Sequence, residues 1–192
     1  MNLTENQKKI YIVFTKTGTW LARTLKYFSA TKYVHTSISF DASFTSMYSF
    51  GRSNPNNPFS GGFVRENIYD GVFKKYGKSE CLIFEVNVTK LQYDGLLKDV
   101  ERFVTNKHLY RYNFLGLFGI LLNRPLDRNY HYFCSQFVYA MLKKHGIVTF
   151  DKVPGLVQTI DLFEIDNKSI LYEGFIDGLR EGISIDQSSF EF

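Results

Sequence analysis

Two residues of this chain have the types and the settings of a nucleophile and its base, and the first is Cys134. It stands where a polar segment, 127–129, gives way to a helical pattern. A thiol in the first turn of a helix faces unpaired backbone N–H groups and the positive end of the helix dipole, and both favour the thiolate. The same N–H groups can bind the oxyanion of a tetrahedral intermediate. The position therefore predicts acyl-transfer chemistry, although a free cysteine can equally be a small buried hydrophobic residue.

His35 is the best candidate for the base. It lies in the strand-like segment 33–41, on the face opposite Val34, Thr36 and Ile38. A strand holds an imidazole rigidly, as a base aimed at a thiol requires, although a histidine in a strand can also be purely structural. His131, three residues before the thiol, ranks second. The remaining histidines are weaker candidates because they lie at helix ends: His108 and His145.

The composition excludes several classes of function. The chain has only two cysteines, Cys81 and Cys134, with no CxxC motif and no cluster at metal spacing, so we expect free thiols and neither metal nor cofactor. The 23 Lys and Arg residues are scattered among 19 Asp and Glu residues, which disfavours a nucleic-acid partner. The polar segment 1–9 and the longest apolar run, 114–122, predict neither a signal peptide nor a transmembrane segment, which favours a cytoplasmic location.

Hydrophobic periodicity predicts an α+β fold in which these side chains sit on strands and helices. At 192 residues the chain suits one domain, 1–192, with an antiparallel sheet or half-barrel packed against helices. We expect a long surface loop over about 51–62 and a loose tail after 182. The expected strands are 9–15, 33–41, 46–50, 63–67, 80–89 and 169–173. The expected helices are 20–29, 91–107 and 133–145, and the almost wholly apolar segment 112–122 is expected to be a buried helix or two buried turns.

Two sequence motifs resemble a known family of hydrolases. They are "Y-x-H-x-S-I-S", which begins at Tyr33, and "Y-F-C-S-Q-F-V", which begins at Tyr132 and follows the apolar segment "YNFLGLFGILLNRP". Together they resemble the permuted papain-like cysteine hydrolases of the NlpC superfamily, the YiiX/YaeF-like proteins, with the lecithin-retinol-acyltransferase-like enzymes as more distant relatives. The resemblance covers roughly residues 10–172. In ordinary papain-like enzymes the cysteine precedes the histidine, whereas here His35 precedes Cys134, which is the permuted order.

The resemblance also implies a third polar residue, which orients the histidine. In the family it usually lies on the strand after the one that bears the histidine, about a dozen residues later, and is commonly a carboxylate, histidine or amide. This chain has "SMYSF" there, residues 46–50, and so departs from the pattern. Side chains alternate along a strand, so only one of Ser49 and Tyr48 can share the face of His35. We expect Ser49 to orient His35, with Tyr48 as the alternative.

These observations predict a metal-independent cysteine peptidase or amidase. Cys134 would form an acyl-enzyme, and His35 would act as general acid and base. The expected substrate is a small peptide, isopeptide, amide or acyl compound, with an amide, peptide or thio/ester bond as the target. The alternative is a catalytically degenerate protein that binds peptide or acyl ligands in the same cleft, and the departure at the third residue favours it.

Overall fold

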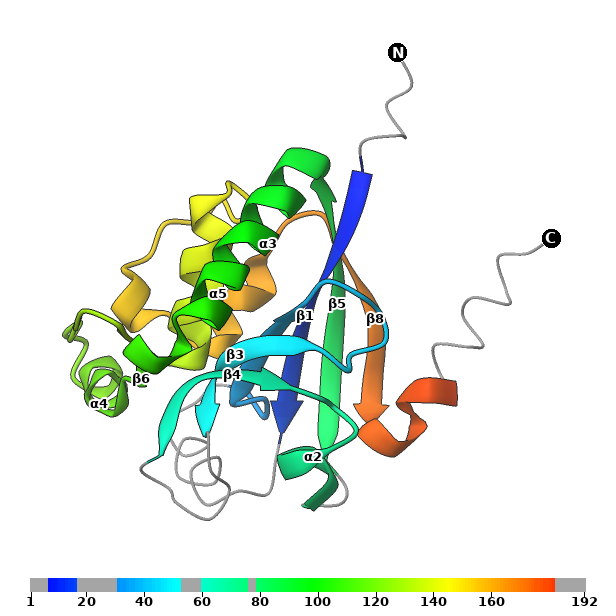
Figure 1. Cartoon of the computed structure of the whole chain (residues 1–192), viewed down its shortest axis with the longest axis horizontal. Coiled ribbons are helices and arrows are strands. Elements are labelled where there is room, and N and C mark those ends of the chain that lie inside the picture. Colours follow the sequence, from blue (N-terminus) through cyan, green and yellow to red (C-terminus); the bar gives the residue numbers. More distant parts are fainter. Residues whose placement is uncertain (1–6, 17–30, 53–59, 76–78, 182–192) are drawn as a thin grey trace.

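The computed structural model describes residues 7–16, 31–52, 60–75 and 79–181. Its centre is a six-stranded antiparallel sheet with the strand order β4-β3-β2-β1-β5-β8 (Figure 1). Strands β1 to β4 therefore form a meander, and β4 and β8 are the two edges. The strands are β1 (Gln7–Lys16), β2 (His35–Ser39), β3 (Met47–Arg52), β4 (Gly61–Glu66), β5 (Glu80–Thr89) and β8 (Lys168–Phe175).

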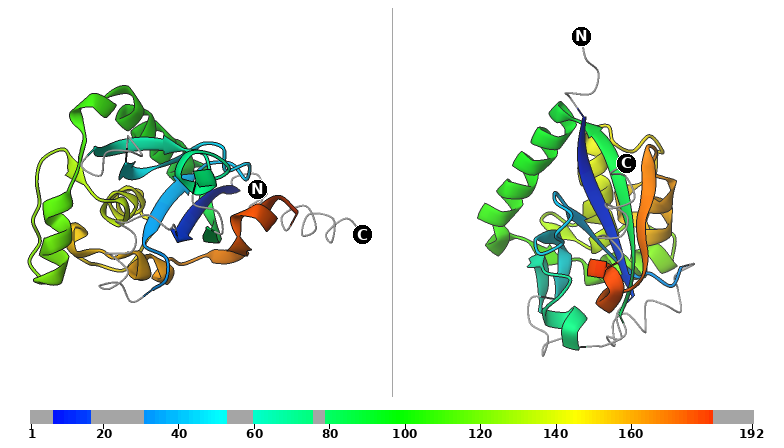
Figure 2. Two further views of the ribbon diagram at one scale, coloured as in Figure 1. Left: turned by 90° about the horizontal axis from the view of Figure 1, so that it is seen from below. Right: turned by 90° about the vertical axis from the view of Figure 1, so that its right-hand side faces the viewer.

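The helices and two short strands lie mostly on one side of this sheet (Figures 1 and 2). Strands β6 (Arg111–Tyr112) and β7 (His131–Tyr132) pair in parallel with each other, outside the main sheet. The α-helices are α2 (Gly71–Lys75), α3 (Lys90–Thr105), α4 (Phe114–Leu121) and α5 (Cys134–Lys144). Short 3-10 turns are η2 (Lys107–Leu109), η3 (Pro154–Leu156), η4 (Thr159–Glu164) and η5 (Ile176–Gly178).

Strand β1 shows how the sequence builds a sheet that is covered on both faces. Ile10, Ile12 and Phe14 point to one face, and Tyr11 and Val13 point to the other, because side chains alternate along a strand. All five are buried. A strand that is buried on both faces must lie inside the sheet, and β1 is paired on both sides, with β2 and β5.

Two hydrophobic clusters cover the two faces. The larger lies between the sheet and helices α3 and α5, and it includes Ile38 and Phe50 from the sheet, Leu96 from α3 and Phe137 from α5. The smaller lies on the opposite face, where Phe73 of α2 is one of its buried members. Because α5 packs over β2 and β3, its first residue comes to the end of β2 at which His35 lies.

The strands predicted from alternation are confirmed, with ends that differ by a few residues. The expected loop over 51–62 is shorter than predicted: β3 continues to Arg52 and β4 begins at Gly61, and 53–59 lie outside the described residues. Gly62 pairs with Gly51 in the sheet, and a Cβ there would lie 2.8 Å from the carbonyl oxygen of Tyr110, so this close approach requires a glycine. The helix expected over 20–29 and the tail after 182 lie outside the described residues.

The apolar segment 112–122 departs from its prediction. It does form a helix, α4, but the helix is not buried: Leu115, Phe118 and Leu121 are exposed. The tight packing occurs at its glycines, since a Cβ at Gly116 would lie 2.5 Å from Asn113 Nδ2. The helix, one of the two alternatives, is therefore confirmed, and the prediction that it is buried is wrong.

Candidate active site

Cys134 is the first residue of α5, as its sequence position predicts. Its side chain is buried, with 5% exposed, and its Sγ lies 3.9 Å from the carbonyl oxygen of Val34. The hydrogen-bond ladder of the helix begins with the N–H of Phe137, which donates to Phe133 O at 3.0 Å. The backbone N–H groups of Cys134 and Ser135 precede that ladder, so they are free of intrahelical partners and lie beside the thiol.

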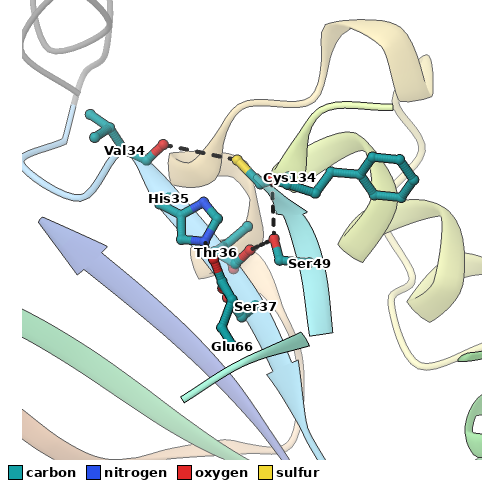
Figure 3. Close-up of polar contacts among 8 residues, drawn as sticks. Val34, His35, Thr36, Ser37, Ser49, Glu66 and Cys134 are labelled. Atoms are coloured by element: carbon teal, nitrogen blue, oxygen red, sulfur yellow. Dashed lines mark hydrogen bonds and ion pairs between the residues drawn. The ribbon is translucent and has the colours of Figure 1, made fainter. Parts of the chain in front are cut away.

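His35 is the first residue of β2, and its ring lies between Cys134 and a carboxylate (Figure 3). Nε2 lies 2.9 Å from Glu66 Oε2 and 3.1 Å from Glu66 Oε1. The opposite side of the ring, which carries Nδ1, faces Cys134. Each partner of the His35–Glu66 ion pair has only 18% of its side chain exposed. The pair is therefore largely shielded from water. Charge-assisted hydrogen bonds are strong in such an environment.

The surroundings keep His35 charged. Burial lowers the pKa of its imidazole, but the negative charge of Glu66, hydrogen bonds with Cys134 and Glu66, and the charge of Cys134 together raise this pKa well above its usual value. Burial likewise raises the pKa of the Glu66 carboxyl, but His35 and a hydrogen bond from Ser37 lower it overall. These shifts favour the charged forms of His35 and Glu66, so the imidazole that lies beside Cys134 is stabilised as its cation.

Glu66 belongs to β4, and β3 separates its strand from that of His35. The carboxylate can cross β3 because Gly51 has no side chain. A Cβ at Gly51 would lie 3.3 Å from Glu66 Oε1 and 3.6 Å from His35 Cε1. Ser37 then holds the carboxylate on the far side, since its Oγ donates to Glu66 Oε2 at 2.7 Å.

The prediction that Ser49 orients His35 is wrong. Ser49 is buried, and its hydroxyl donates to the backbone carbonyl of Thr36 at 2.6 Å. The register pairs Ile38 with Tyr48, so Ser49 lies level with Ser37, two residues along β2 from His35. Tyr48, the alternative, lies on the other face and packs edge-on against Phe40, with ring centroids 6.2 Å apart.

Tyr112 is a further site residue, which the sequence analysis did not single out. It is the last residue of β6 and is 7% exposed. Burial raises the pKa of its hydroxyl well above the usual value, and the charge of Cys134 and a hydrogen bond with Cys134 raise it further. A hydroxyl that stays protonated beside the thiol can donate a hydrogen bond to an oxyanion formed there.

The other histidines and the second cysteine lie elsewhere. His131 hydrogen-bonds through Nδ1 with the backbone carbonyl of Asn129 at 2.7 Å. His145 pairs through Nε2 with Asp99 at 2.8 Å, where it helps to join α5 to α3, and His108 is exposed in η2. Cys81 is buried in β5, and burial raises the pKa of its thiol to about 12.

Glu66 also contributes to the wall of a groove of about 970 Å³ along the edge strand β4. Four basic residues line the same groove: Arg52, Arg65, Lys107 and Arg111. Among the described residues, no cluster of three or more His, Cys, Asp or Glu side chains could hold a metal ion. No helix in the described part of the chain is long and apolar enough to span a membrane.

Comparisons with family models, with curated proteins and with solved structures found no match for this chain.

Proposed function

We propose that this protein is a cysteine hydrolase, in which Cys134 is the nucleophile, His35 the general acid and base, and Glu66 the residue that positions His35. One observation supports this most strongly: the imidazole of His35 lies between a thiol at a helix N-terminus and a half-buried carboxylate. Nucleophile, base and orienting group in this order are the requirement for nucleophilic acyl transfer.

The first half of the reaction forms an acyl-enzyme. The thiolate of Cys134 attacks the carbonyl carbon of the substrate, and the carbonyl π electrons move to oxygen. The backbone N–H groups of Cys134 and Ser135, together with the Tyr112 hydroxyl, are the donors available to that oxyanion. When the carbonyl re-forms, the bond to the leaving group breaks, and the leaving group takes the Nδ1 proton of the His35 imidazolium.

The second half of the reaction restores the enzyme. Neutral His35 takes a proton from water as the water oxygen attacks the thioester carbonyl. Collapse of this second intermediate breaks the C–S bond and releases the acid, so that thiolate and imidazolium are both regenerated. Glu66 accepts a hydrogen bond from Nε2 throughout, which fixes the tautomer of the neutral ring and stabilises the cation.

The fold and the substrate belong to the same proposal. The antiparallel sheet, with the His35 strand inside it and the Cys134 helix packed over it, is compatible with a permuted papain-like arrangement. We propose a small peptide, amide or acyl compound as the substrate and the cytoplasm as the location. The alternative, a degenerate protein that only binds such ligands, depended on a missing third residue, and Glu66 supplies a carboxylate there.

Trapping of the acyl-enzyme tests the proposal. The protein is incubated with an activated ester such as p-nitrophenyl acetate, quenched with acid, and analysed by intact mass and peptide mapping. We expect a single acetyl group on Cys134, its absence in Cys134→Ser, and its strong reduction in His35→Ala. His131→Ala is the matched control and should acylate like the wild type, because His131 hydrogen-bonds within its own loop. Acetylation that persists in His35→Ala would exclude His35 as the base.

A further inference from the structure

Helix α4 presents an apolar surface that no other described element covers. Leu115 is 52% exposed, Phe118 61% and Leu121 45%, and Leu122 just after the helix is 70% exposed. Residues spaced three and four apart lie on one side of a helix, so these side chains form one apolar ridge. The helix projects at one end of the molecule, away from the sheet (Figures 1 and 2).

The loop that follows α4 also exposes apolar side chains. Leu126 is 42% exposed and Tyr130 55%. Six of the twelve exposed large hydrophobic residues in the described part of the chain therefore lie within residues 115–130. Soluble proteins scatter exposed apolar residues singly, and a contiguous cluster marks an interaction surface.

This surface is rigidly held. The Asn113 side chain accepts a hydrogen bond from Gly116 N at 3.0 Å and donates one to Leu126 O at 3.0 Å, which joins the start of α4 to the loop after it. Arg124 N donates to Gly119 O at 2.9 Å, so the loop folds back along the helix. The apolar side chains are thus presented on a preformed unit.

The charges around the ridge are basic. Arg124 and Arg128 are exposed in the loop, and neither forms an ion pair with a described residue. The stretch between Glu101 and Asp151 contains a single acidic residue, Asp127, and its Oδ1 already accepts from Gln136 Nε2 at 3.3 Å. An apolar ridge followed in the chain by two exposed arginines without an ion pair complements a surface that is apolar below and anionic above.

We propose that α4 and the loop after it, residues 114–130, dock onto the surface of a membrane that contains anionic lipids. The apolar ridge would enter the boundary between headgroups and acyl chains, and Arg124 and Arg128 would contact lipid phosphates. Helix α4 has eight residues and is far too short to cross a bilayer, so it would lie in the interface plane. The charges favour this partner over a second copy of the chain, because two such surfaces would bring the arginines together.

The location of the ridge connects it to the candidate active site. Tyr112, whose hydroxyl hydrogen-bonds with Cys134, stands two residues before α4. Docking through α4 would therefore hold the Cys134 site close to the lipid surface. The docking itself depends only on residues 114–130 and does not require that Cys134 be catalytic.

Vesicle co-sedimentation tests the proposal. The full chain is mixed with vesicles of phosphatidylcholine alone or of phosphatidylcholine and phosphatidylglycerol. We expect binding to the anionic vesicles that weakens as salt is added, and a partition coefficient at least about tenfold lower for Phe118→Asp/Leu122→Asp. Arg124→Glu/Arg128→Glu should remove the preference for anionic lipid. Leu91→Asp is the matched control, because Leu91 is 84% exposed at the start of α3, and it should bind like the wild type.

Two further measurements make the outcome decisive. Circular dichroism must show the same fold in every variant, and Cys134→Ser should bind as the wild type does, which separates docking from catalysis. Equal binding to both vesicle types, or no binding to either, would refute the proposal. Self-association of the wild type in sedimentation velocity, abolished by Phe118→Asp/Leu122→Asp, would assign the ridge to a second copy of the chain instead.

Discussion

Glu66 Oε2 lies 2.9 Å from His35 Nε2, although a whole strand separates the two residues in the sheet. The contact exists because Gly51 on the intervening strand leaves the space above it open. It raises the pKa of a half-buried histidine whose other ring nitrogen faces Cys134. Each of the predictions below depends on this relationship or on the surroundings of the thiol.

Replacement of Glu66 should reduce the reactivity of Cys134. Glu66→Gln removes the negative charge that raises the pKa of His35. At a pH above the pKa of His35, the imidazolium becomes about tenfold scarcer for each unit by which that pKa falls. Alkylation of Cys134 by iodoacetamide near neutral pH should therefore slow by about tenfold or more. Ser49→Ala is the control: Ser49 bonds to Thr36 O, so its removal should leave the alkylation rate unchanged. If Cys134 were alkylated slowly in Ser49→Ala and at the wild-type rate in Glu66→Gln, Ser49 and not Glu66 would be the residue that orients His35.

The His35–Glu66 pair should also stabilise the fold within a defined pH window. The pKa of His35 is raised in the folded protein, so its contribution is complete below the unfolded value of about 6.5 and is lost as pH rises through the folded pKa. The pKa of Glu66 is lowered, so its contribution is complete above about 4.5 and is lost as pH falls through the folded pKa.

The two contributions overlap between about pH 4.5 and 6.5, where Glu66→Gln should lower the free energy of unfolding by about 3 kcal/mol. Urea denaturation of the two proteins over a pH series measures this difference. It should shrink at alkaline pH, as His35 loses its proton in the folded protein. A difference that is constant, or that grows toward high pH, would contradict the ion pair.

Gly51 should tolerate no branched side chain. In Gly51→Val the new methyl groups would occupy the space between His35 and Glu66, and the carboxylate would have to leave the imidazole. We expect the alkylation rate of Cys134 to fall as far as it does in Glu66→Gln. Gly51→Ala should have a milder effect, because its Cβ would lie 3.3 Å from Glu66 Oε1 and a small shift relieves the contact. Wild-type reactivity in Gly51→Val would mean that the carboxylate does not orient the ring.

Tyr112 should matter for acylation more than for alkylation. Acylation passes through an oxyanion, and removal of one donor to such an oxyanion typically lowers the rate by about a hundredfold. Alkylation by iodoacetamide creates no oxyanion, so Tyr112→Phe should change its rate much less. Tyr132→Phe is the matched control, because Tyr132 pairs with Tyr112 in the β6–β7 register. If the rates of acylation and alkylation fell equally, Tyr112 would only pack around the thiol and would not bind the oxyanion.

The sequence alone predicts the parts of this protein that depend on local patterns. The strands follow from alternation, as in β1, and α5 follows from its apolar face and its end at Gly146. Both His35 and Cys134 could be selected because their roles need only a strand or a helix start. Local pattern, together with the resemblance of the two motifs, was therefore sufficient to choose a candidate nucleophile and a candidate base.

The rest of the site depends on contacts between residues that are distant in the sequence. Glu66 is 31 residues from His35 and two strands away, and it meets the ring only because Gly51 lies between them. Gly51 was interpreted as the start of a loop, which concealed the space it leaves. Tyr112 belongs to a segment that was interpreted as buried packing, and nothing in its spacing relates it to Cys134.

The most direct test of the central claim is the rate of alkylation of each cysteine as a function of pH. Limiting iodoacetamide is added to the native protein between pH 5 and 9, and labelling is quantified by peptide mapping. We expect Cys134 to be labelled at pH 6 with a rate that His35→Ala strongly reduces and His131→Ala does not. Cys81, whose burial raises its pKa to about 12, should stay unlabelled. Equally slow labelling of both cysteines, with protection lost only on unfolding, would contradict the Cys134–His35 pair.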